Sequence, residues 1–369
     1  MTFAIRVSLI MAIAIALPAQ VAVAQAPKNG NAGLSDKPNA VRGDEITPRQ
    51  QAAVERGLAY LAGRQARNGS FGMGAAYGRG EGGHPGITAL AGLAFMSAGN
   101  LPGRGKYADN VAKALSFILA CSQQSGFIAQ STSGEMYSHG FATLFLAEIY
   151  GMTGDDEVRE KLVKAVQLIQ KTQNKDGGWR YNPVPADADI SITICQVMAL
   201  RAARDAGIKV SKDVIEDAIK YVKTCRCPDG GFSYTAGGMG SAFPRSAAGV
   251  AALYYAGVFE GDDITKGLKY LQRFVPGKAK AGAAGVMANV GGHYYYGHYY
   301  AVQAMFLAGG EYWREWYPAI REELIQKQVA NNGGWSGDAG EDYATAMALI
   351  ILQMPNRYLP VFHGKGPGS

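Results

Sequence analysis

The sequence predicts an all-α protein built as a single α/α toroid, a double ring of six inner and six outer helices. Three observations lead to this prediction. A short motif recurs about every 50 residues along the 369-residue chain. Each repeat contains an amphipathic helix followed by a helix that is apolar on nearly every side. The chain has 49 glycines without a low-complexity run, so its glycines mark turns between helices.

The repeated motif runs from a basic residue through a Gln to a Gly-rich turn and a final aromatic residue. Two complete copies with the same spacing occupy 56–71 and 164–179. Partial copies end at Phe127, Phe232 and Trp335, and a further copy starts at Lys266 but loses its second half. Because the glycines end a helix and permit positive φ, we expect the motif to stabilise the junctions between units.

The helices of each unit differ in their apolar pattern. The first helix, for example 156–173 or 211–224, has charges on one face and apolar residues at helical spacing, as expected of an outer ring. The second helix lacks a polar face and must be covered on most sides, as expected of an inner ring. The predicted inner helices are 88–98, 139–150, 190–203, 246–255, 299–307 and 343–353.

The N-terminus has the pattern of an export signal. Arg6 precedes an apolar run over 7–17, and the small residues of 22–24 indicate cleavage before Gln25. The alternative is an N-terminal membrane anchor. The expected organisation is a signal peptide (1–24), a flexible leader (25–46), the toroid domain (47–356) and a C-terminal tail (357–369), in a periplasmic or secreted protein.

Composition excludes several classes of partner. The net charge of +6 is spread along the chain without a basic stripe, so no nucleic acid is expected. After cleavage of the signal, no stretch reaches the roughly 18 apolar residues of an integral membrane span. The Cys225-Arg226-Cys227 stretch lacks a second Cys pair or a spaced His pair, so neither a metal nor another cofactor is expected. The four cysteines permit up to two disulfides in an oxidising compartment.

The repeat motif resembles the QW repeat of squalene and oxidosqualene cyclases and is similar to the repeats of protein prenyltransferase β subunits. The resemblance covers nearly all of 47–356. Segments such as 137–140 (Tyr-Ser-His-Gly) and 177–181 (Gly-Gly-Trp-Arg-Tyr) resemble secreted bacterial proteins with prenyltransferase or squalene-cyclase repeats. The resemblance implies the toroid fold of the terpenoid cyclase superfamily.

The resemblance also implies a catalytic acid. Cyclases of this kind protonate an alkene with an Asp-x-Asp-Asp motif at the start of an inner helix, and 187–190 here reads Asp-Ala-Asp-Ile. Asp189 matches the proton donor, Asp187 matches its neighbour, and Ile190 replaces the last carboxylate. The alternative is that Asp189 only caps the helix that begins at Ile190. The Asp-x-Cys zinc motif of protein prenyltransferases is absent from the chain.

Further candidates gather at the N-terminal ends of the inner helices, which share one rim and favour anions there. His139 is expected to form an acid–base pair with Asp189, or else a structural hydrogen bond. Arg245 matches the Arg-Ser of prenyltransferase β subunits and is expected to bind an anion, or else to be a solvated rim charge. The aromatic stretch 291–300 is expected to line a pocket, or else to pack tightly in the inner ring. The remaining candidate binding residues are His293, Tyr296, His298, Tyr299 and Asp342.

These features predict a toroid that binds an apolar, isoprenoid-type small molecule, with acid–base catalysis by Asp189 and His139. Two alternatives stay open. One is a non-catalytic toroid whose rim binds a glycan or an envelope protein. The other is a polysaccharide lyase or hydrolase with a base and an anion-binding Arg at the rim.

Overall fold

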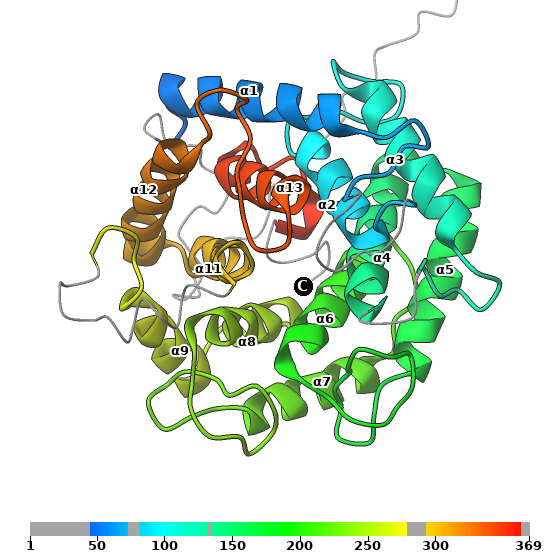
Figure 1. Cartoon of the computed structure of the whole chain (residues 1–369). Helices are drawn as coiled ribbons and strands as arrows, with labels where there is room; N and C mark the ends of the chain where they lie inside the picture. Colours follow the sequence, from blue (N-terminus) through cyan, green and yellow to red (C-terminus); the bar gives the residue numbers. More distant parts are fainter. Residues whose placement is uncertain (1–44, 73–81, 131–134, 279–292, 363–369) are drawn as a thin grey trace, which may run out of the picture. The chain divides into compact units, whose positions relative to one another are not determined.

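The computed structural model describes residues 45–72, 82–130, 135–278 and 293–362 (Figure 1). The predicted signal peptide and the predicted leader up to residue 44 lie outside these residues. All the described residues belong to one compact unit that spans Gly33–Ser369. Within them every regular element is a helix.

The helices alternate between two rings, as the sequence predicts. The outer helices are α1 (Pro48–Arg64), α3 (Ala108–Cys121), α5 (Asp156–Lys171), α7 (Lys212–Thr224), α9 (Asp262–Gln272) and α12 (Gly310–Lys327). The inner helices are α2 (Pro85–Met96), α4 (Glu135–Thr153), α6 (Ile190–Asp205), α8 (Phe243–Ala256), α11 (Tyr294–Ala308) and α13 (Glu341–Leu352). Most residues of the inner helices are buried, because other helices cover them on nearly every side.

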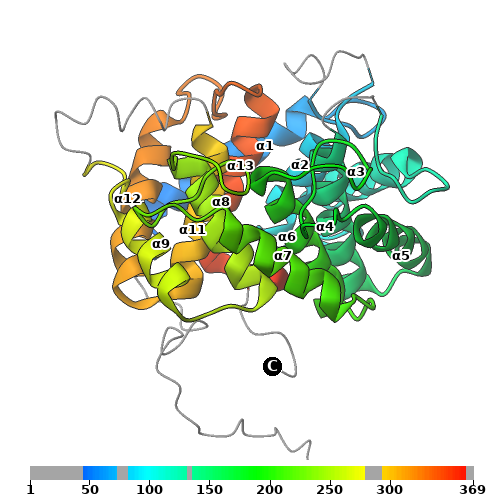
Figure 2. The same cartoon turned by 90° about the horizontal axis from the view of Figure 1, so that it is seen from below.

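The inner helices form a closed ring. Each packs against the next in chain order, and α13 packs against α2 to complete the circle (Figure 1). Each outer helix packs against the inner helix that precedes it around the ring, which for α1 is α13. In Figure 2, α9 and α12 lie on one side and α3 and α5 on the other, with inner helices between them. The predicted all-α toroid is therefore confirmed.

The Gln of the repeat motif joins neighbouring units. The side-chain amide of Gln173 donates to the carbonyl of Gly177 in its own turn, at 2.8 Å, and to the carbonyl of Val214 in α7, also at 2.8 Å. The same pair of bonds is made by Gln65 and Gln328. The Trp179 indole also donates to the backbone within its own unit, at Ile169. The motif therefore stabilises the junctions between units, as its sequence predicts.

Among the described residues, a second hydrogen bond recurs in five units. A backbone N–H at the end of the Gly-rich turn donates to a side chain in the first turns of the following inner helix, at 2.9–3.2 Å. The five donor–acceptor pairs are Phe71–Thr88, Ile128–His139, Trp179–Thr193, Phe232–Ser246 and Trp335–Thr345. His139 thus occupies a position that carries Thr or Ser in four other units.

Aromatic side chains of α11 reach into the centre of the ring. Tyr299 meets Phe141 of α4, the opposite inner helix in the ring order, with ring centroids 6.1 Å apart and an edge-to-face geometry. The Tyr299 hydroxyl donates to the sulfur of Met198 at 3.6 Å, and the Tyr300 hydroxyl lies 3.2 Å from the Cys195 sulfur. These contacts join α4, α6 and α11 at this level.

Both ends of the described chain pack onto the toroid. Glu45, in the predicted leader, is buried and accepts a hydrogen bond from the Trp313 indole at 2.8 Å. Pro360–Phe362, in the predicted tail, forms a 3-10 helix that packs on α6. All four cysteines are buried and unbridged. Among the described residues no helix is both long and apolar enough to span a membrane.

Candidate functional site

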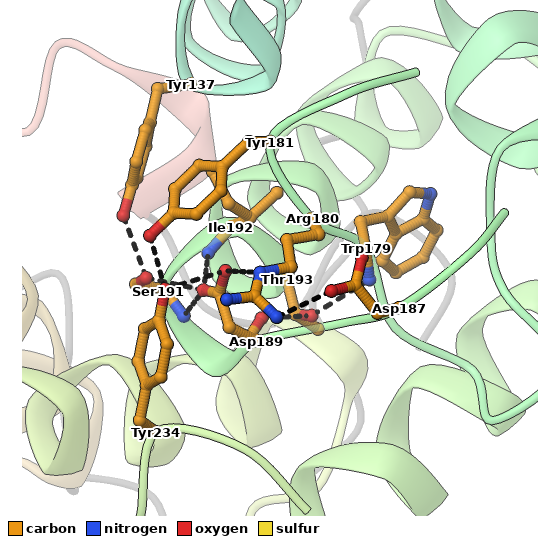
Figure 3. A network of polar contacts seen from close by, with 10 residues as sticks. All are labelled: Tyr137, Trp179, Arg180, Tyr181, Asp187, Asp189, Ser191, Ile192, Thr193 and Tyr234. Atoms are coloured by element: carbon orange, nitrogen blue, oxygen red, sulfur yellow. Dashed lines mark hydrogen bonds and ion pairs between the residues drawn. The ribbon is translucent and has the colours of Figure 1, made fainter. Parts of the chain in front are cut away.

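Asp189 is the N-cap of α6, the third inner helix (Figure 3). Its Oδ1 accepts hydrogen bonds from the backbone N–H of Ser191 at 2.8 Å and of Ile192 at 2.9 Å, and from the Ser191 hydroxyl at 2.5 Å. An N-cap Asp is favoured here because the first N–H groups of a helix lack partners within the helix. The capping role that the sequence offers as an alternative is therefore confirmed.

The second oxygen of Asp189 has different partners. Its Oδ2 accepts a hydrogen bond from the Tyr234 hydroxyl at 3.2 Å, and the Tyr234 hydroxyl also bonds the Tyr181 hydroxyl (Figure 3). The turn that carries Tyr234 is held against the start of α6, because the N–H of Ile190 donates to the carbonyl of Tyr234 at 3.0 Å. A chain of three polar groups therefore runs from the buried carboxylate through two phenols.

Ser191 extends the network on the other side. Its hydroxyl accepts from the Tyr137 hydroxyl at 2.8 Å, and its carbonyl accepts from the Tyr296 hydroxyl at 3.1 Å. The rings of Tyr137 and Tyr181 lie side by side, 6.2 Å apart. Tyr296, predicted as a binding residue, thus lies next to the residues around Asp189.

Arg180 connects Asp189 with Asp187. Its Nη1 lies 2.6 Å from Oδ2 of the exposed Asp187, and its Nε lies 3.7 Å from Oδ2 of Asp189. The guanidinium also lies 5.5 Å and 5.7 Å from the ring centroids of Tyr181 and Tyr234. The structure therefore brings the two predicted catalytic carboxylates together, with an arginine between them.

Burial sets the protonation of this cluster. It raises the pKa of the Asp189 carboxyl above its usual value, against the hydrogen bonds from Ser191, Ile192 and Tyr234, which lower it. Burial also raises the pKa of the Tyr137 and Tyr234 phenols, which therefore keep their protons at neutral pH and remain donors. A carboxyl with a raised pKa beside protonated phenols can take up or release a proton.

His139 lies apart from this cluster in its bonding. It is fully buried in the second turn of α4, where Nδ1 accepts from Ile128 at 3.2 Å and Nε2 lies 3.3 Å from the carbonyl of Ala165. Burial lowers its pKa to about 4, so the ring is neutral at physiological pH. Both ring nitrogens thus bond backbone groups, in agreement with the structural hydrogen bond that the sequence leaves open.

The other predicted binding residues lie in different surroundings. His298 is buried against Phe243 and Trp316, and burial lowers its pKa to about 3. Asp342 is buried and bonds Arg64 at 2.8 Å and the N–H of Gly72 at 2.8 Å.

His293, Arg245 and Tyr299, the remaining predicted binding residues, lie in three different parts of the toroid. His293 is an exposed residue at the start of α11. Arg245 is half-buried in the first turn of α8, and its Nε has no hydrogen-bond partner among the described residues. Tyr299 lies in the ring centre.

Sequence reasoning missed Arg180, Tyr181 and Tyr234 as site residues. A signal was present, because Tyr181 and Tyr234 each stand two residues after the final aromatic of their repeats, Trp179 and Phe232. Equal positions in adjacent units of a ring lie side by side. Among the described residues, no three His, Cys, Asp or Glu side chains lie close enough together to hold a metal ion.

Comparisons with known proteins agree on the fold. A model of the prenyltransferase alpha-alpha toroid domain family matches residues 89–285, more than half of the chain. No curated protein sequence matches the chain.

Several solved structures with different activities resemble the toroid. One is an inactive variant of the alpha-1,6-mannanase GH76A of Salegentibacter sp. HEL1_6 in complex with alpha-1,6-mannotriose (TM-score 0.61, 12% identity, 84% of this chain and 99% of that chain). The cellobiose 2-epimerase from Spirochaeta thermophila DSM 6192 has a TM-score of 0.61, 13% identity, and 85% and 99% coverage. The type II terpene cyclase MstE from Scytonema has a TM-score of 0.58, 13% identity, and 84% and 99% coverage. Identities this low support the shared fold alone.

Proposed function

This chain belongs to the prenyltransferase alpha-alpha toroid domain family, and we propose that its site is the rim around Asp189, where it binds a carbohydrate and carries out acid–base chemistry on it. One observation carries the proposal. The fully buried carboxyl of Asp189, at the start of an inner helix, is linked through Tyr234 to the hydroxyl of the half-buried Tyr181.

The side chains around Asp189 suit a sugar. Phenol hydroxyls and a guanidinium can bond sugar hydroxyls, and aromatic faces can cover the C–H face of a sugar ring. Tyr137, Tyr181 and Arg180 offer these groups within a small area (Figure 3). The shared fold of a mannanase and a cellobiose epimerase is compatible with carbohydrate chemistry on a toroid.

The packing at the centre of the ring favours a carbohydrate over an apolar ligand. An apolar ligand of drug size needs a concave, mostly apolar pocket. At the level of Phe141 and Tyr299, side chains of opposite inner helices meet across the ring. A ligand near Asp189 therefore lies among polar groups on the N-terminal side of this contact.

An isoprenoid-type substrate is the second candidate, because Asp189 holds the position of the proton donor in cyclases and burial raises its pKa. A type II terpene cyclase also shares the fold. His139 does not enter either proposal, since both of its nitrogens bond the backbone.

We also propose that the protein acts outside the cytoplasm, in the periplasm or after secretion, as the signal-like N-terminus indicates. Its ligand would then be a glycan of the envelope or of the surroundings.

The test starts from the exported protein. Mass spectrometry of the small molecules that purify with it, followed by binding to a glycan array, identifies the ligand class. We expect bound oligosaccharide, and we expect Tyr181→Ala to weaken array binding at least about tenfold. Tyr358→Ala is the matched control, because Tyr358 is an exposed tyrosine in a different segment. Co-purified polyprenoid lipid would favour the second candidate, and equal binding by both variants would overturn the rim site.

A further inference from the structure

Asp189 is sealed from any ligand. Its side chain has no exposed surface, its Oδ1 is occupied by three donors, and its Oδ2 accepts from Tyr234. Tyr234 in turn bonds the Tyr181 hydroxyl. Tyr181 and Tyr234 are both half-buried, and because only Tyr234 bonds the carboxylate, Tyr181 is the end of this chain farther from Asp189.

We infer that Tyr181 is the catalytic residue that takes the proton from the ligand, and that Asp189 acts through Tyr234 as the positioning residue that finally holds this proton. This inference rests on the proposed function, since it names the group that meets the carbohydrate. In this inference the ligand does not touch the Asp189 carboxylate, and its proton reaches the carboxylate through the two phenols.

The transfer balances in three moves. A hydroxyl or C–H group of the sugar gives its proton to the Tyr181 oxygen, and the electron pair of the broken bond stays on the sugar. The Tyr181 proton passes to the Tyr234 oxygen, and the Tyr234 proton passes to Oδ2 of Asp189. Both phenols end neutral as they began, Asp189 becomes a carboxylic acid, and no other reactant is consumed.

The two carboxylate oxygens of Asp189 differ in a way that selects this path. Oδ1 accepts two backbone N–H groups and a hydroxyl, so a proton there would disrupt the cap of α6. Oδ2 accepts a single phenol hydroxyl, with Arg180 at 3.7 Å. The branch through Ser191 to Tyr137 ends at Oδ1 and therefore serves as an internal comparison.

Burial supplies the driving force. A carboxylate in a buried position is destabilised relative to its neutral form, which makes Asp189 a better proton acceptor than an exposed Asp. The ionisable groups around Asp189 are Tyr137, Arg180, Tyr181, Asp187, Cys195, Tyr221, Cys225, Tyr234 and Tyr296.

The first experiment needs no ligand. Carbon-13 NMR of aspartate-labelled protein, with Asp189 assigned from the signal that Asp189→Asn removes, follows the titration of this carboxyl. Tyr234→Phe removes a donor to the charged form and is expected to raise the Asp189 pKa further. Tyr181→Phe should raise it less, and Tyr137→Phe should change it least. An unchanged pKa in Tyr234→Phe, with the fold intact by circular dichroism, overturns the chain of transfer.

The second experiment uses the glycan that the array identifies. Tyr181→Phe keeps the aromatic face, so we expect binding within about twofold of wild type and a loss of turnover of about 100-fold or more. In Tyr234→Phe the pH profile of the residual turnover should follow the shifted pKa of Asp189. Full turnover in Tyr181→Phe overturns the inference while leaving the carbohydrate site in place. Absence of any glycan binding contradicts the proposed function itself, and the NMR titration separates the two failures.

Discussion

His139 illustrates how the place of a residue in the repeat decides its chemistry. It accepts a hydrogen bond from the turn of its own unit, at the position where four other units have Thr or Ser. Burial keeps it neutral, with a pKa lowered to about 4. A histidine in this setting joins a turn to a helix and has no nitrogen free for a ligand.

We predict that His139→Ala lowers the free energy of unfolding by about 1–3 kcal/mol, because it leaves the buried N–H of Ile128 without a partner. His139→Thr, which restores the side chain found in neighbouring units, should lose less. Urea unfolding of both variants checks the order. Loss of ligand turnover in a well-folded His139→Thr would contradict the structural role.

Glu148 is a buried acidic residue whose pKa differs between the folded and unfolded states. It is buried in α4, where its carboxyl accepts a hydrogen bond from the N–H of Val361 at 3.2 Å. Burial raises its pKa to about 8, and the nearby Asp205 raises it as well. The folded protein therefore prefers Glu148 neutral, whereas the unfolded chain ionises it near its ordinary value of 4.5.

The pH dependence of stability follows from this difference. Because the folded pKa is the higher one, the contribution of Glu148 is fully present below pH 4.5 and is lost as the pH rises through about 8. We predict that wild type loses about 2–5 kcal/mol relative to Glu148→Gln between pH 4 and pH 9. Urea unfolding at both pH values measures it. Parallel pH dependence of the two proteins would show that Glu148 is ionised when folded.

At the scale of elements, the Gly-rich turns fix the distance between neighbouring outer helices. Gly177 has φ +95°, and a Cβ added there would lie 2.1 Å from the carbonyl oxygen of Asp217 in α7. Gly207 has nearly the same backbone, with φ +86°, but open space around the corresponding Cβ. The two glycines therefore separate backbone strain from close approach of the next unit.

We predict that Gly177→Ala destabilises the protein by about 3–5 kcal/mol and that Gly207→Ala costs about 1 kcal/mol. Both substitutions place a side chain at a residue with positive φ, which strains the backbone. Only Gly177→Ala also forces α5 and α7 apart, because its Cβ would meet the carbonyl of Asp217. Chemical unfolding of the pair gives the difference. Similar losses of stability in the two variants would mean that α5 and α7 can move apart at little cost.

At the scale of the whole molecule, the first and last units must meet to close the ring. α1 packs against α13, and Asp342 bonds both Arg64 of α1 and the N–H of Gly72. The Tyr60 hydroxyl of α1 also bonds Glu341. Asp342 therefore stabilises the closure, and this geometry accounts for its burial without a ligand.

We predict that Asp342→Ala lowers the free energy of unfolding by about 2–4 kcal/mol, since it leaves the buried N–H of Gly72 and the Arg64 guanidinium without their partner. Asp262→Ala is the control, because Asp262 pairs with Lys266 on an exposed surface, and it should change the free energy of unfolding much less than Asp342→Ala does. Limited proteolysis should cleave α1 faster in Asp342→Ala only. Equal protection in both variants would show that closure depends on apolar packing alone.

Much of the fold was predictable, but less of the site. The spacing of Gln173 and Gly177 indicated a turn that joins units, and the structure has those bonds. The spacing around Asp189 indicated a cap or an acid, yet its phenol partner Tyr234 lies 45 residues away in the next unit. Local periodicity cannot report a bond that forms only when two units lie side by side.

The sequence by itself determined the helices and their order in two rings, because helical periodicity and glycine turns depend on residues a few positions apart. Only the tertiary structure decided which polar residues are buried, paired or accessible. In the closed ring Asp342 bonds Arg64, and His139 accepts a hydrogen bond from the turn of its own unit. Asp189 accepts a hydrogen bond from Tyr234 of the next unit. The physical reason is that desolvation and pairing depend on neighbours from other units, and these are adjacent only in the closed ring.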